Sequence, residues 1–237
     1  MCYTVLYYLN KGRQAMPKQI TIICGHYGSG KTNFALNLAI DRMRRGEAVT
    51  VVDLDIVNPY FRSSDYTGLL EENGVTVISP ATAGTTVDAP ALTARMASVF
   101  QRGEGAAIID AGGDDAGAAA LGRFSKRIED SGSWQMLYVI NKYRRLISSP
   151  EEAVALLREI EASSRLRATG IVNNSHLAGL TTAEDILSSV DYARKTAALC
   201  GLPLLMTTAP KAVSGELEGK VNNLYPVDIL VKLPWNT

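Results

Sequence analysis

The sequence has no long apolar run, no paired cysteines and no net charge, and each absence excludes a class of protein. No stretch of about 18 apolar residues occurs, so we expect no transmembrane helix. The tail at residues 230–235 is strand-like and broken by a proline, unlike a basic amphipathic helix, so we also expect no membrane association. Cys2, Cys24 and Cys200 are far apart, which excludes a disulfide scaffold and a paired-cysteine metal site. This cysteine usage favours a reducing cytoplasm. The 24 basic and 24 acidic side chains cancel, so no overall charge favours binding to nucleic acid.

The length of 237 residues suits one large α/β domain. Residues 1–15 contain an apolar patch with no basic segment before it, which is a poor signal peptide. We expect them to be a flexible arm, or an over-long start with the natural one at Met16. Residues 16–237 contain no repeat, low-complexity tract or linker, and are expected to form a single domain.

From Gln19 onward, short β-branched runs alternate with longer segments of helical spacing, a pattern typical of βαβ units. Runs that are apolar at nearly every position predict parallel strands covered on both faces. The expected strands span residues 19–24, 48–52, 75–79, 106–109, 135–140, 169–172 and 202–207, with a candidate edge strand at 225–233. Capping boxes are predicted at Ser149 with Glu152 and at Thr181 with Glu184. The sequence therefore predicts a three-layer αβα fold around a mostly parallel sheet of seven to eight strands.

One segment matches the pattern Gly-x-x-x-x-Gly-Lys-[Ser/Thr] and lies between a predicted strand and a predicted helix. Its residues are Gly25, His26, Tyr27, Gly28, Ser29, Gly30, Lys31 and Thr32. Glycines allow backbone N–H groups to surround phosphates, and the following helix N-terminus favours negative charge. We expect Lys31 to reach the β and γ phosphate oxygens, and Thr32 to supply a hydroxyl to Mg²⁺. Together with Asn33, these residues are the predicted phosphate loop of a P-loop NTPase.

Carboxylates follow two of the predicted strands. Asp53 and Asp55 end the second strand, and Asp110 ends the fourth. Because ligands bind at the carboxyl ends of parallel strands, we expect these carboxylates to converge on the phosphates and their metal. Asp110 would hold Mg²⁺ through water. Gly112 and Gly113 would let the backbone move when a γ-phosphate is present.

The phosphate loop, the Asp-x-Asp after the second strand and the Asp-Ala-Gly-Gly at 110–113 resemble the MinD/ParA/nitrogenase-iron-protein group of the SIMIBI class of P-loop NTPases. The resemblance spans roughly residues 19–212, and extends to bacterial ATP-binding proteins of the CobQ/CobB/MinD/ParA nucleotide-binding group. It implies that Asp55 orients the attacking water or binds the metal shell, with Asp53 supporting it. Asn58 lies in the switch-I-like loop and is a candidate γ-phosphate sensor; a turn asparagine before a proline is the equal alternative.

The same resemblance implies where the base is bound. The class reads the base with an asparagine after the sixth strand and with a loop after the seventh, which here are Asn173 or Asn174 and the loop at Pro210. An asparagine amide can both donate to and accept from a purine edge, although the pair also suits a strand-ending turn. No Asn-Lys-x-Asp guanine motif is present, which favours ATP and ADP over guanine nucleotides.

Two features bear on partners. Many dimerising ATPases of this class have a lysine at the position of His26, where it reaches the partner's nucleotide. A neutral imidazole attracts the partner's phosphates less strongly than a lysine does. The sequence therefore allows a homodimer but does not predict that ATP drives dimerisation through the residue at position 26. Basic clusters at 42–45, 123–127, 142–145 and 165–167 would suit sequence-independent DNA binding. Charged helix ends are usually solvated, so the sequence does not favour DNA.

Two functions of different classes fit these motifs. The first is a Mg²⁺-dependent switch ATPase whose nucleotide state controls an unidentified protein partner. The alternative is a transferase or ligase that moves the γ-phosphoryl group to a small metabolite, as dethiobiotin-synthetase-like proteins and small-molecule kinases do. Such enzymes need a cationic lid over the phosphates, for which Arg62 and Arg95 are the only candidates near the crevice. A module that binds nucleotide without hydrolysing it is disfavoured by the acidic strand ends.

Overall fold

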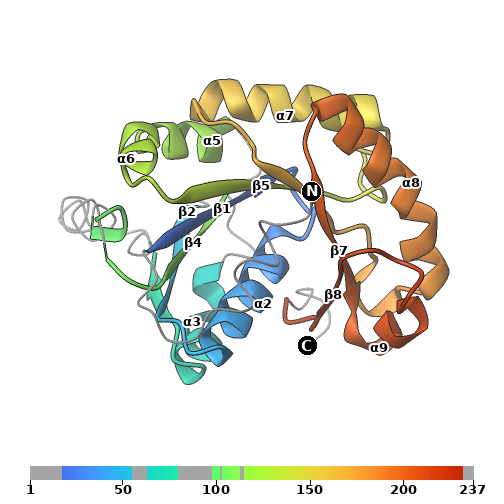
Figure 1. The fold of residues 1–237 in the computed structure, drawn as a ribbon, viewed down its shortest axis with the longest axis horizontal. Helices are drawn as coiled ribbons and strands as arrows, with labels where there is room; N and C mark the ends of the chain where they lie inside the picture. Colours follow the sequence, from blue (N-terminus) through green and yellow to red (C-terminus); the bar gives the residue numbers. More distant parts are fainter. Residues whose placement is uncertain (1–17, 55–62, 80–97, 102, 113–114, 232–237) are drawn as a thin grey trace.

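The computed structural model describes residues 18–54, 63–79, 98–101, 103–112 and 115–231. A single eight-stranded sheet runs through its centre, in the order β3-β2-β4-β1-β5-β6-β7-β8 (Figure 1). The strands are β1 Gln19–Gly25, β2 Val49–Leu54, β3 Thr76–Ile78, β4 Ala106–Ala111, β5 Trp134–Ile140, β6 Gly170–Asn173, β7 Leu204–Pro210 and β8 Leu224–Val227. Every pairing between neighbouring strands is parallel. The predicted parallel sheet is confirmed, and the candidate edge strand is the short β8.

Helices cover both faces of this sheet (Figure 1). On one face lie α2 (Lys31–Arg44) and α3 (Thr67–Glu72). On the other lie α5 (Asp115–Gly122), α6 (Ser125–Asp130), α7 (Pro150–Ser164) and α8 (Ala183–Cys200). The short α9 (Lys211–Ser214) follows β7, and single 3₁₀ turns form η1 (Ser63–Tyr66), η2 (Ala178–Leu180) and η3 (Gly215–Leu217). The three-layer αβα architecture is therefore as predicted.

Strand β1 illustrates why the strands are apolar at almost every position. Successive side chains of a strand point to opposite faces, so Ile22 packs with the α5–α8 layer and Ile23 packs with the α2–α3 layer. Both side chains are completely buried. The same two-sided burial holds at every position of β4. Within the described residues, no helix is both long and apolar enough to cross a membrane.

The helix starts were predicted with one error. The box of Ser149 and Glu152 caps α7 as expected. Helix α8, however, is capped by Thr182 and Asp185, one residue after the predicted pair. Thr181 is used elsewhere: its hydroxyl accepts a hydrogen bond from the backbone N–H of Leu177 and donates one to the carbonyl of Ala178, closing η2. The predictions for residues 1–15, Asp55, Asn58, Gly113 and the two lid candidates Arg62 and Arg95 lie outside the described residues.

Candidate nucleotide-binding site

The predicted phosphate loop joins β1 to α2 at the centre of the sheet, where β1 lies between β4 and β5. Its backbone requires glycine at two positions. A Cβ at Gly25 would lie 2.3 Å from the carbonyl oxygen of Val139, and one at Gly30 would lie 2.2 Å from Nδ2 of Asn174. Both glycines have positive φ values, 147° and 88°. The loop is therefore pressed against β5 on one side and against the segment after β6 on the other.

The N-terminus of α2 is built differently from those of α7 and α8. Its N-cap is Gly30, no side chain of the described residues caps it, and its first turn contains no acidic residue. Helices α7 and α8 each carry a complete capping box and two acidic residues in the first turn. The first-turn N–H groups of α2 and the positive end of its dipole are thus available to an anion.

Lys31 lies inside the loop. The residue is only 6% exposed, and its Nζ donates a 3.0 Å hydrogen bond to the carbonyl oxygen of His26, at the other end of the loop. The ammonium group therefore lies at the loop's centre, where a phosphate would be surrounded. Thr32 follows in the first turn and is half-buried.

Two carboxylates lie beside this loop on neighbouring strands. Asp53 of β2 and Asp110 of β4 are register partners, so their side chains point to the same face of the sheet. Asp110 is also in register with Ile23 of β1, two residues before the loop begins. Both aspartates are at most 1% exposed, and the backbone N–H of Ser64 donates to Oδ2 of Asp53 over 3.1 Å.

These oxygens fit the magnesium ion that a P-loop nucleotide implies. Mg²⁺ takes oxygen ligands, keeps several waters and needs only one or two carboxylates besides the phosphates. The Asp53–Asp110 pair and the Thr32 hydroxyl provide this donor set without any nitrogen or sulfur ligand. Among the described residues no cluster of three or more His, Cys, Asp or Glu exists, so the structure offers no all-protein metal cage.

The two predicted base-reading asparagines are completely buried and hydrogen-bonded within the protein. Nδ2 of Asn173 donates to Oγ of Ser189 over 2.9 Å. Nδ2 of Asn174 donates to the carbonyl oxygen of Ser29 over 2.7 Å, and its Oδ1 accepts from Oγ1 of Thr208. Asn174 thus supports the phosphate loop, and a base-reading role for either amide stays a prediction. Pro210 is buried at the end of β7, immediately before α9.

Asn33 points away from the loop, toward the C-terminal segment. Its Nδ2 donates to the carbonyl oxygen of Asp228 over 3.0 Å, and its Oδ1 accepts from the backbone N–H groups of Leu230 and Val231. The side chain therefore fastens the chain after β8 to α2, a role that the sequence does not predict.

No protein-family model and no curated protein matches the sequence. Solved structures do match it. The signal recognition particle 54 kDa protein of Aeropyrum pernix K1, in complex with GDP, is 21% identical over 83% of this chain and 42% of its own, with a TM-score of 0.55. FtsY of Mycoplasma mycoides is 16% identical over 82% of this chain and 61% of its own (TM-score 0.57), and FtsY of Thermotoga maritima is 18% identical over 88% and 68% (TM-score 0.53).

This is the three-layer αβα fold of P-loop NTPases. The chain spans less than two thirds of the length of the first two of these proteins. At such identities the likeness concerns the fold alone, and membership of the SIMIBI class and of its MinD/ParA branch stays a prediction.

One residue near the phosphate loop is not predicted from the sequence. Arg144 follows β5, and its Nε lies 3.5 Å from the point that a Cβ on Gly28 would occupy. From the sequence, the basic cluster that contains it indicates a solvated surface or a DNA-binding patch, because spacing along the chain does not tell which loop folds over which.

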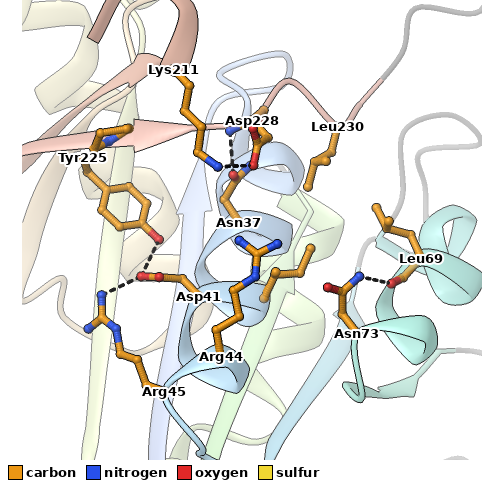
Figure 2. A pocket seen from close by; sticks show the side chains of 12 residues that line it. Asn37, Asp41, Arg44, Arg45, Leu69, Asn73, Lys211, Tyr225, Asp228 and Leu230 are labelled. Carbon is orange, nitrogen blue, oxygen red and sulfur yellow. Dashed lines mark hydrogen bonds and ion pairs between the residues drawn. The ribbon is translucent and has the colours of Figure 1, made fainter. Parts of the chain in front are cut away.

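A cavity of about 320 Å³ lies elsewhere, against the second half of α2 and beside β8 (Figure 2). Asp41, which lines it, is about 15 Å along the helix axis from Lys31. Most of the charged side chains that line the cavity are paired: Arg45 with Asp41 over 2.6 Å, and Lys211 with Asp228 over 2.5 Å. Tyr225 Oη also donates to Asp41 Oδ2. The Tyr225–Asp41 bond joins β8 to α2, and the Lys211–Asp228 pair joins α9 to the chain after β8, so both have a structural role.

Proposed function

We propose that this protein is a Mg²⁺-dependent nucleoside triphosphatase whose nucleotide state controls a protein partner, with ATP as its nucleotide. The observation that carries this proposal is the N-terminus of α2, which has no side-chain cap among the described residues and has the Lys31 ammonium group held in front of it. A helix start of this kind favours a bound anion, because its first-turn N–H groups and the positive end of its dipole face the same side. A triphosphate is the anion that a loop of this pattern accommodates.

We propose the following roles in that reaction. Lys31 binds the β and γ phosphate oxygens and stabilises the charge that develops on them. Thr32 and Asp110 hold Mg²⁺, which offsets the negative charge of the phosphates when bound. Asp55 orients the attacking water, with Asp53 supporting it, as the resemblance to the SIMIBI class implies.

The choice of ATP rests on the missing Asn-Lys-x-Asp motif. The Aeropyrum pernix protein with the same fold was solved with GDP, so guanine nucleotides are the alternative to be tested. A fluorescent ATP analogue displaced by unlabelled ATP or GTP measures this preference directly. Tighter binding of GTP would overturn the adenine assignment and leave the triphosphatase proposal standing.

The proposal that the nucleotide state controls a protein partner is supported by exposed apolar side chains at the edge of the sheet that carries the phosphate loop. Of the five large apolar side chains exposed among the described residues, four lie in loops after β1, β5 and β6, namely Tyr27, Leu146, Leu177 and Leu180. Leu180 is 85% exposed. Because these loops leave the carboxyl edge of the sheet, a partner bound there would contact the nucleotide's surroundings. Mass measurement in solution with ADP and with a non-hydrolysable ATP analogue tests whether that partner is a second copy.

The experiment that tests the enzymatic proposal is nucleotide binding and phosphate release by the purified full chain, with no acceptor metabolite added. We expect Lys31→Ala to lower affinity for MgATP by about 10- to 100-fold, the worth of a charge-assisted hydrogen bond to phosphate, and to abolish turnover. Lys220→Ala, which removes an exposed lysine, is the matched control. Unchanged turnover in Lys31→Ala would contradict the proposal, and ADP formation that requires an added metabolite would favour the phosphoryl-transfer alternative.

A further inference from the structure

Arg144 lies against the phosphate loop, although it is more than a hundred residues away in sequence. The three atoms nearest to a Cβ built on Gly28 all belong to its side chain: Nε at 3.5 Å, Cζ at 3.7 Å and Cδ at 3.8 Å. Gly28 itself is exposed, as is Arg144. The guanidinium group is therefore at the surface, beside the backbone that the phosphates would contact.

The loop that carries Arg144, residues 141–149, is held firmly by its neighbours. Its hydrogen bonds reach the segment after β6 and the first turns of α8: Lys142 N to Ser175 Oγ (2.8 Å), Asn141 Nδ2 to the His176 carbonyl (3.2 Å), Tyr143 Oη to the Asp185 carbonyl (2.7 Å) and Lys142 Nζ to the Ser188 carbonyl (3.0 Å). On the far side of Arg144, the Ile147 side chain is completely buried and its carbonyl accepts from Tyr192 Oη over 2.6 Å. The fold thus fixes the backbone on both sides of Arg144.

The charge of Arg144 is not used in an ion pair within the described part of the chain. The phosphate loop, residues 25–32, contains no acidic residue that would attract the guanidinium. A cation in this position adds to the positive end of the α2 dipole and to Lys31. A guanidinium group is planar, and its paired N–H donors match the spacing of phosphate oxygens.

We propose that Arg144 is a further phosphate-binding residue of this site, donated by the same chain and contacting the phosphates of the bound nucleotide. This inference rests on the proposed nucleotide function. Because the contact is with phosphate, it contributes to the binding of ATP and ADP alike, and not to the binding of adenosine. It also leaves the preference for one base over another unchanged.

The test compares Arg144→Ala, Arg144→Lys and the matched control Arg145→Ala, which removes the neighbouring exposed arginine of the same loop. The readout is affinity for ATP, ADP and adenosine, measured by calorimetry or displacement with the full chain. We expect Arg144→Ala to weaken ATP binding by about 10-fold or more, with part of the loss restored by lysine. Arg145→Ala is expected to bind like the wild type.

The outcomes separate this inference from the function on which it rests. Wild-type protein that binds no nucleotide would overturn both. Wild-type protein that binds ATP, together with equal affinities in Arg144→Ala and Arg145→Ala, would overturn the role of Arg144 alone. Equal loss of adenosine binding in Arg144→Ala would also overturn it, because that pattern reports a disturbed pocket. Since Arg144 is exposed, we expect the variants to unfold at the wild-type temperature, which a thermal melt checks.

Discussion

The side-chain amide of Asn174 donates a 2.7 Å hydrogen bond to the backbone carbonyl of Ser29, in the middle of the phosphate loop. The oxygen of the same amide accepts a hydrogen bond from the hydroxyl of Thr208 in β7. One buried side chain therefore connects the phosphate loop to the ends of β6 and β7. These strand ends carry the residues of the predicted base site, so Asn174 connects that predicted site to the phosphate loop.

Replacing Asn174 by alanine tests this support. The substitution removes a donor from the carbonyl of Ser29 and leaves a gap behind the loop, so we expect a loss of about 1–3 kcal/mol in the free energy of unfolding. Nucleotide affinity should fall as well, because the loop loses its fixed shape. Urea unfolding and ATP titration measure the two effects. Asn222→Ala, at an exposed position, is the control. Equal stability and equal ATP affinity in the two variants would show that the Asn174–Ser29 hydrogen bond contributes to neither.

Gly25→Ala tests how tightly the loop is packed against β5. The added Cβ would lie 2.3 Å from a backbone carbonyl oxygen of Val139, which cannot move without breaking the sheet. Gly46→Ala is a matched control, because Gly46 also has a positive φ value but no atom lies within 4 Å of its Cβ position. We expect the control to lose about 1–2 kcal/mol from backbone strain. Gly25→Ala should lose more and should not bind nucleotide; similar losses in both would refute the packing argument.

The sheet was predictable from sequence because parallel strands buried on both faces must be apolar at nearly every position, as β4 is. The phosphate loop was predictable because its glycines and lysine are adjacent in the chain. What sequence could not supply is the set of contacts between distant segments. Asn174 lies 145 residues from Ser29. Nothing in the local sequence distinguishes an asparagine that supports the phosphate loop from one that binds the base. The α8 cap was misplaced by one residue because two threonines stand side by side.

Asn33→Ala separates a structural role from the nucleotide contact predicted from sequence. The side chain makes three hydrogen bonds to the segment after β8, at Asp228, Leu230 and Val231. Their loss should lower the free energy of unfolding by about 1–3 kcal/mol and increase proteolysis of the C-terminal segment. Affinity for ATP should change less than twofold. A large loss of affinity with unchanged stability would instead support the sequence prediction.

The pH dependence of stability should report the buried imidazole of His176. Burial lowers the pKa of this group to about 4, and the positive charge of Arg144 adds to the effect. Its Nδ1 accepts from the backbone N–H of Ala178, and its Nε2 has no hydrogen-bond partner among the described residues. Between about pH 6.5 and 4 the unfolded chain binds the proton more readily than the folded chain, so stability falls as the pH falls through this window.

His176→Asn removes that titration while keeping an acceptor for the N–H of Ala178. The wild type should lose up to about 3 kcal/mol between pH 7 and pH 4 through this group, and the variant should lose correspondingly less. Urea unfolding at both pH values gives the difference. His26→Asn, which removes the only other histidine, is the control for the effect of losing a histidine outside the core on the difference in unfolding free energy between the two pH values. Parallel stability curves for the wild type and His176→Asn would rule out this source of acid sensitivity.

Asp110→Asn tests the proposed magnesium site through the gain in ATP affinity that the metal provides. Asp110 and Asp53 are buried register partners on adjacent strands, and the substitution removes one of these two carboxylates while keeping the size of the side chain. With Mg²⁺, the variant should lose most of the gain in ATP affinity that the metal gives the wild type. Titrations of ATP with magnesium and with a chelator measure this gain, Asp130→Asn at an exposed helix end is the control, and an undiminished gain in Asp110→Asn would remove Asp110 from the metal site.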